Sequence, residues 1–124
     1  MVSKRARELR ERVLQRALEF PETYLDHPWG ETVAKVNKKV FLFAGSDDGD
    51  RAGISVKLPE SRDQALGLAG AEPTGYGLGR AGWVSITFGA RPPPVGVLLD
   101  WLEESYRTVA PKRLVRQLDN PGER

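Results

Sequence analysis

The sequence predicts an α+β fold, a two-layer sandwich in which an antiparallel sheet carries its helices on one face. Several short segments alternate apolar and polar residues, as strands with one buried face do. The first and last thirds of the chain place apolar residues at steps of three and four, as amphipathic helices do. The order of the segments is helix, three strands, helix, strands, helix. We therefore expect the helices to cover the apolar side of one sheet.

The length and composition predict a single domain. The chain has 124 residues, of which 40% are hydrophobic and 29% charged, and these are ordinary globular values. We expect residues 1–111 to form this domain and residues 112–124 to be a basic C-terminal tail, frayed or loosely docked. The chain has no cysteine, which excludes disulfides, thiolate nucleophiles and zinc sites of the cysteine type. No apolar run suits a membrane span or a secretory signal, so we expect a cytoplasmic protein without membrane partners.

Three segments read as helices. Residues 3–20 carry one apolar stripe and end at Pro21. Residues 59–69 start with a proline and are followed by Gly70, the two residues that favour helix starts and ends. Residues 95–110 carry a second apolar face and end at Pro111. The residues of that face are Leu98, Trp101, Leu102, Ser105 and Val109.

Four segments read as strands, namely residues 32–36, 40–44, 54–58 and 83–88. Asn37, Lys38 and Lys39 form a tight hairpin between the first two. Residues 21–30, 45–53 and 71–82 are rich in glycine, proline or polar residues, and we expect them to be loops.

The charge is unevenly spread along the chain. Residues 1–16 carry a net charge of +4, residues 112–124 carry +2 and the middle of the chain carries −4. The basic first helix could contact phosphate groups, but Glu8 and Glu11 lie at spacings that pair part of its charge internally. The sequence pI of about 9.1 only just reaches the value typical of nucleic-acid-binding domains.

No motif assembles into an active site, so we expect no enzyme, no cofactor and no metal. Residues 77–82 match GxGxxG, but a strand follows where a dinucleotide fold needs a helix. His27 is the only histidine, and Asp26, His27 and Ser105 form no recognisable triad by sequence. Asp47, Asp48 and Asp50 lack the spacing of a calcium loop, and turn-forming residues at a hairpin tip explain them better.

The polar face of the sheet is the candidate site. By alternation it carries Lys35, Ser55, Lys57, Trp83, Ser85 and Thr87, and Arg80 enters from the adjacent loop. An exposed tryptophan beside lysines and hydroxyl groups is suited to stack on bases and to contact phosphates. The alternative is that Trp83 packs under the loop of residues 71–82 and that the lysines are merely solvated.

Several stretches in a fixed order carry a family resemblance. They are Phe20-Pro21-Glu22, His27-Pro28-Trp29-Gly30, residues 36–41, residues 54–60, residues 75–83 and residues 105–109. In this order they resemble the MmcQ/YjbR family from about Leu9 to Val109. The resemblance implies a CyaY-like fold and DNA binding through a double-wing arrangement of strands and loops.

The resemblance also implies which side chains form the site. The positions that match the polar signature of the family are Trp29, Lys57, Tyr76, Arg80 and Trp83. Glycines replace polar or basic residues of the family in the stretch 76–83, which implies weaker binding if those side chains contact nucleic acid in relatives.

DNA is thus the first expected partner. A protein or a small ligand on the same open face is the second, with Trp29, Tyr76 or Trp83 as its anchor. An iron-binding role would need an acidic first helix, and here that helix is basic.

Overall fold

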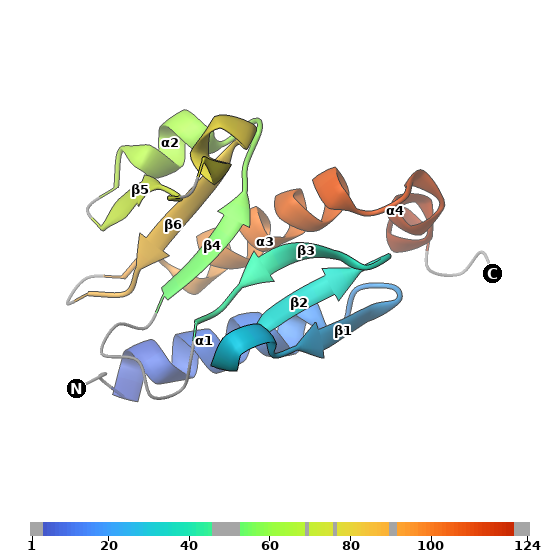
Figure 1. Ribbon diagram of the computed structural model, residues 1–124, viewed down its shortest axis with the longest axis horizontal. Helices are drawn as coiled ribbons and strands as arrows, with labels where there is room; N and C mark the ends of the chain where they lie inside the picture. The colour runs from blue at the N-terminus through green and yellow to red at the C-terminus, as the bar shows by residue number, and fades with distance from the viewer. Residues whose placement is uncertain (1–3, 46–52, 69, 76, 90–91, 121–124) are drawn as a thin grey trace.

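The computed structural model describes residues 4–45, 53–68, 70–75, 77–89 and 92–120, and of Trp29 it describes the backbone alone. Within these ranges the chain forms four α-helices, two 3₁₀ turns and six strands (Figure 1). The helices are α1 (Lys4–Ala17), α2 (Arg62–Leu66), α3 (Val95–Val109) and α4 (Lys112–Asp119), and the 3₁₀ turns are η1 (Pro28–Gly30) and η2 (Leu78–Ala81). The strands are β1 (Thr23–Asp26), β2 (Val33–Val36), β3 (Lys39–Phe43), β4 (Gly53–Lys57), β5 (Ala71–Pro73) and β6 (Trp83–Thr87).

The six strands form one antiparallel sheet in the order β1-β2-β3-β4-β6-β5. Helices α1 and α3 lie behind the sheet, whereas no long helix lies in front of it (Figure 1). This is the predicted two-layer α+β sandwich. We call the side that packs against α1 and α3 the covered face, and the other side the open face.

The core lies between the covered face and the two long helices. Val56 and Val84 from the sheet and Leu98 and Leu102 from α3 have no exposed surface. Three aromatic rings close one end of this core: the ring of Tyr106 lies 4.7 Å from that of Phe20 and 5.4 Å from that of Phe41. Burial of this apolar surface is the main force that holds the two layers together.

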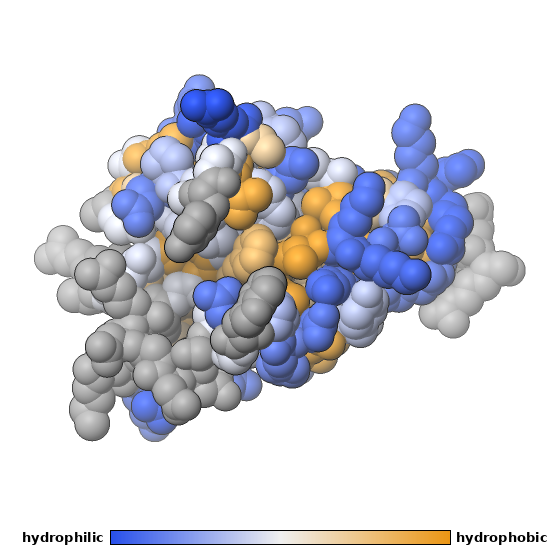
Figure 2. All heavy atoms as spheres, in the orientation of Figure 1, coloured by the Kyte–Doolittle hydropathy of each residue, from blue (hydrophilic) through white to orange (hydrophobic). Residues whose placement is uncertain are grey.

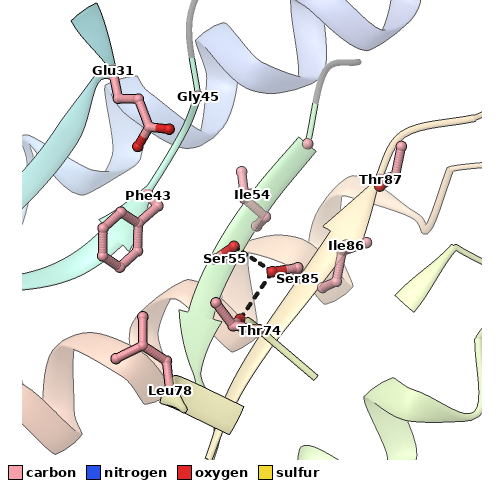
Figure 3. A pocket seen from close by; sticks show the side chains of 11 residues that line it. Glu31, Phe43, Gly45, Ile54, Ser55, Thr74, Leu78, Ser85, Ile86 and Thr87 are labelled. Atoms are coloured by element: carbon pink, nitrogen blue, oxygen red, sulfur yellow. Dashed lines mark hydrogen bonds between the residues drawn. The ribbon is translucent and has the colours of Figure 1, made fainter. Parts of the chain in front are cut away.

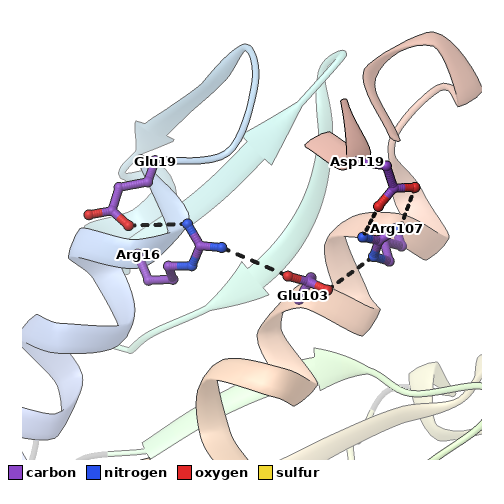
Figure 4. Close-up of polar contacts among 5 residues, drawn as sticks. All are labelled: Arg16, Glu19, Glu103, Arg107 and Asp119. Atoms are coloured by element: carbon purple, nitrogen blue, oxygen red, sulfur yellow. Dashed lines mark hydrogen bonds and ion pairs between the residues drawn. The ribbon is translucent and has the colours of Figure 1, made fainter. Parts of the chain in front are cut away.

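A chain of ion pairs joins three helices at their solvent side (Figure 4). Arg16 of α1 lies 3.8 Å from Glu103 of α3, and Glu103 accepts a hydrogen bond of 3.1 Å from Arg107. Arg107 also pairs with Asp119 of α4, and these two carboxylates raise the pKa of Arg107 while Arg107 lowers that of Asp119. Because the side chains are partly exposed, each pair contributes little to stability, and the chain mainly fixes how the helices are aligned.

The hairpin between β2 and β3 is as predicted. Val36 pairs with Lys39, so Asn37 and Lys38 alone form the turn. Both have positive φ angles, 52° and 65°, which match the twist of a two-residue hairpin. The exposed lysines at positions 38 and 39 therefore lie at the tip of the hairpin.

Four details of the sequence prediction are wrong. Residues 21–30 contain strand β1 and residues 71–82 contain strand β5, although both segments were expected to be loops. Helix α2 spans Arg62–Leu66 rather than residues 59–69. Residues 112–119 form helix α4, whose Leu114 is buried in the core, so this part of the basic tail is ordered rather than frayed. No helix within the described ranges is long and apolar enough to cross a membrane.

Candidate nucleic-acid interface

The open face is the part of the molecule where the predicted site residues meet. On this face a band of hydrophobic surface runs between hydrophilic regions, one over α4 and the β2–β3 hairpin and one around α2 and η2 (Figure 2). The same strands present their other side to α1 and α3, as alternation requires. Among the described residues, no α-helix covers β2, β3 and β4 on the open face.

The sheet opens at one end into two halves. Strands β3 and β4 pair at Leu42 with Val56 and at Phe43 with Ser55, and beyond these pairs the strands diverge (Figure 1). There the buried hydroxyl of Ser105 replaces a direct bond between the strands. It accepts a hydrogen bond of 2.9 Å from the backbone N–H of Lys57 and donates one of 2.5 Å to the carbonyl of Phe41. A side chain of α3 thus links the two halves and also sets the distance between their strands.

Both halves carry cations at the end where they diverge, which we call the cationic end. In an antiparallel pair the start of β3 and the end of β4 lie at the same end of the sheet. The β2–β3 hairpin brings Lys38 and Lys39 there, β4 brings Lys57, and η2 brings Arg80. None of these four cations has an acidic partner within 4.0 Å among the residues that the structure describes.

Helix α4 extends the cationic end. Arg113 donates a hydrogen bond of 2.8 Å to Glu22, and Glu22 precedes Thr23, which pairs with Val36 beside the hairpin tip. The same bond lowers the pKa of Glu22. With Glu22 and Asp119 occupied by arginines, Lys112 and Arg116 remain as exposed cations of α4. Carboxylates lie near the end of β4 as well: Glu60 is exposed in the loop after it, and Glu104 of α3 accepts hydrogen bonds from the backbone N–H groups of Glu60 and Ser61.

Trp83 does not form the predicted exposed platform. Alternation placed it correctly on the open face, opposite Lys57, but its side chain is only 7% exposed. The η2 turn lies over this part of the sheet (Figure 1), and the indole packs against Phe43 with ring centroids 5.2 Å apart. The expectation of an exposed indole, on which the hypothesis of base stacking depended, is therefore wrong, and Trp83 is buried, as the alternative expected.

Lys35 lies on the open face as predicted, but its ammonium group is already paired with a carboxylate. Its ammonium group donates a hydrogen bond of 2.7 Å to Asp26. That bond, with a second one from the backbone N–H of His27, lowers the pKa of Asp26, and Asp26 raises the pKa of Lys35. Asp26 comes from β1, the strand that the sequence did not predict. Lys35 is consequently a weaker candidate for phosphate contact than Lys57.

Two predicted site residues cannot be placed. Tyr76 lies outside the described residues, and of Trp29 only the backbone is described, within η1. The aspartates 47, 48 and 50 also lie outside the described residues. The roles that the resemblance implies for Trp29 and Tyr76 therefore stay predictions.

The glycines of residues 77–82 shape the turn over Trp83 and form no nucleotide loop. Gly77 and Gly82 have φ angles of 79° and 94°, which side chains other than glycine rarely adopt. A Cβ atom on Gly79 would approach the Cβ of Pro73 to 2.9 Å, so glycine lets η2 lie close to β5. The strand β6 follows at once, in agreement with the prediction of a turn before a strand.

A groove in the open face contains three linked hydroxyl groups (Figure 3). Ser85 lies 2.7 Å from Ser55 and 2.9 Å from Thr74, oxygen to oxygen. The groove has a volume of about 310 Å³. Phe43 and Leu78 form its sides and Glu31 lies at one end. We call it the hydroxyl groove. Sequence reasoning put Ser55 and Ser85 on this face but not Thr74 or Leu78, because β5 and η2 were taken for one loop.

The metal-binding and triad groupings considered from the sequence are not assembled among the described residues. No three histidine, aspartate or glutamate side chains there form a group that could hold a metal ion. Ser105 is buried on the covered face with its hydroxyl bound to backbone, whereas His27 is exposed and follows β1. Asp26, His27 and Ser105 are therefore not arranged as a nucleophile with its base.

The comparison with protein families agrees with this architecture. The sequence model of the YjbR family matches residues 18–108. The chain belongs to the YjbR family. The YjbR match begins at the end of α1 and ends near the end of α3, so it contains the whole sheet, the hydroxyl groove and Ser105. Helices α1 and α4 lie outside the YjbR match. No curated protein matches the sequence.

Proposed function

We propose that this protein is a nucleic-acid-binding module, without catalytic activity, that contacts the phosphate backbone through its cationic end. The observation that carries the proposal is the divergence of the two halves of the sheet, each of which ends in exposed or partly exposed cations that have no acidic partner within 4.0 Å among the described residues. Two projecting ends that carry cations can follow two stretches of a polyanion at once. The DNA binding implied by the family resemblance fits this arrangement.

The burial of Trp83 changes how such binding would work. Without an exposed indole, base stacking on this residue cannot supply affinity. Phosphate contacts from Lys38, Lys39, Lys57 and Arg80 then supply most of it, and such contacts carry no sequence information by themselves. The proposal therefore predicts binding with little sequence preference on duplex DNA and with a strong dependence on salt.

Fluorescence anisotropy of a short labelled duplex, titrated at two salt concentrations, tests the proposal. Each neutralised phosphate releases counterions, so four contacts predict a loss of about 100-fold in affinity between about 50 and about 200 mM salt. Binding that is absent at the lower salt concentration, or equal at both, contradicts the proposal.

Two double variants of equal charge locate the surface. Lys57→Gln with Arg80→Gln should lower affinity and reduce the salt slope by about 2. Arg7→Gln with Arg12→Gln, both exposed on α1 in the other layer, removes the same charge and should leave the slope unchanged. If the α1 variant loses affinity instead, the basic first helix is the binding surface. Both variants should keep their stability to within about 0.5 kcal/mol, because the replaced side chains lie at the surface.

A further inference from the structure

The hydroxyl groove is built for a ligand that both donates and accepts hydrogen bonds. Ser55, Ser85 and Thr74 each carry one hydroxyl proton, and the two bonds among them use two of the three. The third proton is free to donate to a ligand. Because hydroxyl groups rotate, the chain of bonds can run in either direction. The free proton can therefore lie at Ser55 or at Thr74, while the other end accepts.

The sides of the groove suit a flat ring. Phe43 is half-buried along one side of the groove, between Glu31 towards one end and Leu78 of η2 towards the other (Figure 3). The Phe43 ring is held by the edge of Trp83 at an interplanar angle of 66°, so it does not need to be ordered when a ligand binds. A planar ring that packs on Phe43 and touches the aliphatic side chain of Leu78 gains dispersion and apolar burial.

Glu31 gives the groove a preference among flat rings. It is exposed at the Gly45 end of the groove, and an ionised carboxylate only accepts hydrogen bonds. A ring with an exocyclic amine can donate to it, as cytosine does through N4, whereas thymine presents a carbonyl oxygen at the same position. The carboxylate therefore favours rings that carry an amine and disfavours thymine.

The groove and the cationic end share the open face of β4. Lys57 follows Ser55 by two residues, so both side chains lie on the open face of β4, about 7 Å apart along the strand. A strand of nucleic acid with one base in the groove would thus have its phosphate groups near an ammonium group. The half-polar groove and the adjacent cations together match the two parts of a nucleotide.

We infer that the hydroxyl groove takes one unpaired base with an exocyclic amine, presented by a nucleic-acid strand whose phosphates bind the cationic end. This inference rests on the proposed function and adds the class of substrate: single-stranded or locally unpaired nucleic acid. The hydroxyl groups bind the edge of the base, Phe43 packs on one of its faces beside Leu78, and Glu31 accepts from its amine.

Anisotropy titrations with two short labelled strands test the inference. One strand consists of thymines and the other contains a central cytosine. The wild-type protein should bind the strand with cytosine about tenfold more tightly. Glu31→Gln should abolish this ratio, because an amide both donates and accepts. Glu8→Gln on α1 changes the net charge equally and should leave the ratio unchanged. The ratio is the readout because both substitutions also remove a negative charge and so raise affinity for any strand.

A second pair of variants tests the hydroxyl groups. Ser85→Ala breaks the chain at its centre and should weaken binding of the strand with cytosine about fivefold. Thr108→Ala removes an exposed hydroxyl of α3 and should have no effect. Thermal unfolding of both variants shows whether they remain folded, and the ratio in Glu31→Gln gives a readout that does not depend on Ser85.

The outcomes separate this inference from the proposed function. Equal binding of the two strands by the wild-type protein overturns the inference, while salt-dependent duplex binding would leave the proposed function in place. The last experiment is a titration of the protein with free cytidine, monitored by NMR. Cytidine binding that is sensitive to Ser85→Ala, without binding of any strand, would overturn both the proposed function and the strand as the source of the base. Absence of all binding overturns both.

Discussion

The covered face and the open face of the sheet satisfy their hydroxyl groups in different ways. On the covered face, Ser105 bonds to the backbone of two strands, and Tyr106 donates a bond of 2.8 Å to the carbonyl of Pro21. On the open face, Ser55, Ser85 and Thr74 bond to one another. Bonds to backbone are fixed by the fold, whereas a chain of side-chain hydroxyl groups keeps a proton that a ligand can use. The hydroxyl groups of the covered face are thus committed to the fold, whereas those of the open face keep a donor that the proposed binding would use.

Trp83 is the residue that can break this comparison, because it is buried although it lies on the open face. If it is a core residue, Trp83→Ala should lower the free energy of unfolding by about 3–5 kcal/mol. Urea unfolding followed by circular dichroism measures the loss. A loss below about 1 kcal/mol would mean that the indole is effectively in solvent, and the exposed platform expected from the sequence would have to be considered again.

The stability losses of two serine variants, one on each face, test the comparison further. Ser105→Ala leaves the N–H of Lys57 and the carbonyl of Phe41 without the partner that they have in the structure, and an unsatisfied buried group costs about 1–3 kcal/mol. Ser55→Ala on the open face should have a smaller effect, because the groove admits water. The same urea titration compares the two variants, and equal losses would contradict the distinction between the faces.

Substitution of Tyr106 should give the smallest change in stability, and this change should depend on pH. Burial raises the pKa of Tyr106 to about 12, whereas a phenol in the unfolded chain titrates near about 10. The neutral phenol therefore contributes stability that is fully present below about pH 10 and is lost as the pH rises towards 12. Tyr106→Phe should cost about 1 kcal/mol at pH 7.

The stability difference between Tyr106→Phe and the wild-type protein should narrow above about pH 10, since the variant has no phenol to ionise. Unfolding at pH 7 and at about pH 11 measures the two differences. An unchanged difference would show that this phenol does not resist ionisation.

Most of the sheet could be predicted from alternation alone. Ile54 and Val56 pack in the core while Ser55 and Lys57 face the other way, as their period of two requires. The strands that were missed are short and lie at the two edges of the sheet. Strand β1 follows Pro21 and precedes Pro28, and β5 ends at Pro73, so local turn residues masked them. Tertiary pairing, and not local preference, makes these segments strands.

The errors in the predicted site follow from the edge strands that the sequence analysis missed. The sequence placed Lys35 on the correct face, but it could not show that Asp26 of β1 lies within 2.7 Å of its ammonium group. Likewise Trp83 faces the predicted side, but η2 covers it. That turn can lie close to the sheet because Gly79 has no Cβ to collide with Pro73. The face on which a side chain lies is set locally within its strand, whereas the exposure of that side chain depends on segments distant in sequence.

The divergence of the strands has a consequence for the shape of the molecule. The span between the hairpin tip and η2 depends on what is inserted between Phe41 and Lys57, and here that insert is a single hydroxyl group of α3. The side chain of Ser105, on a helix of the opposite layer, thus acts as a spacer between the diverging ends of β3 and β4. Related proteins with a bulkier residue at this position should open wider and accommodate a thicker partner.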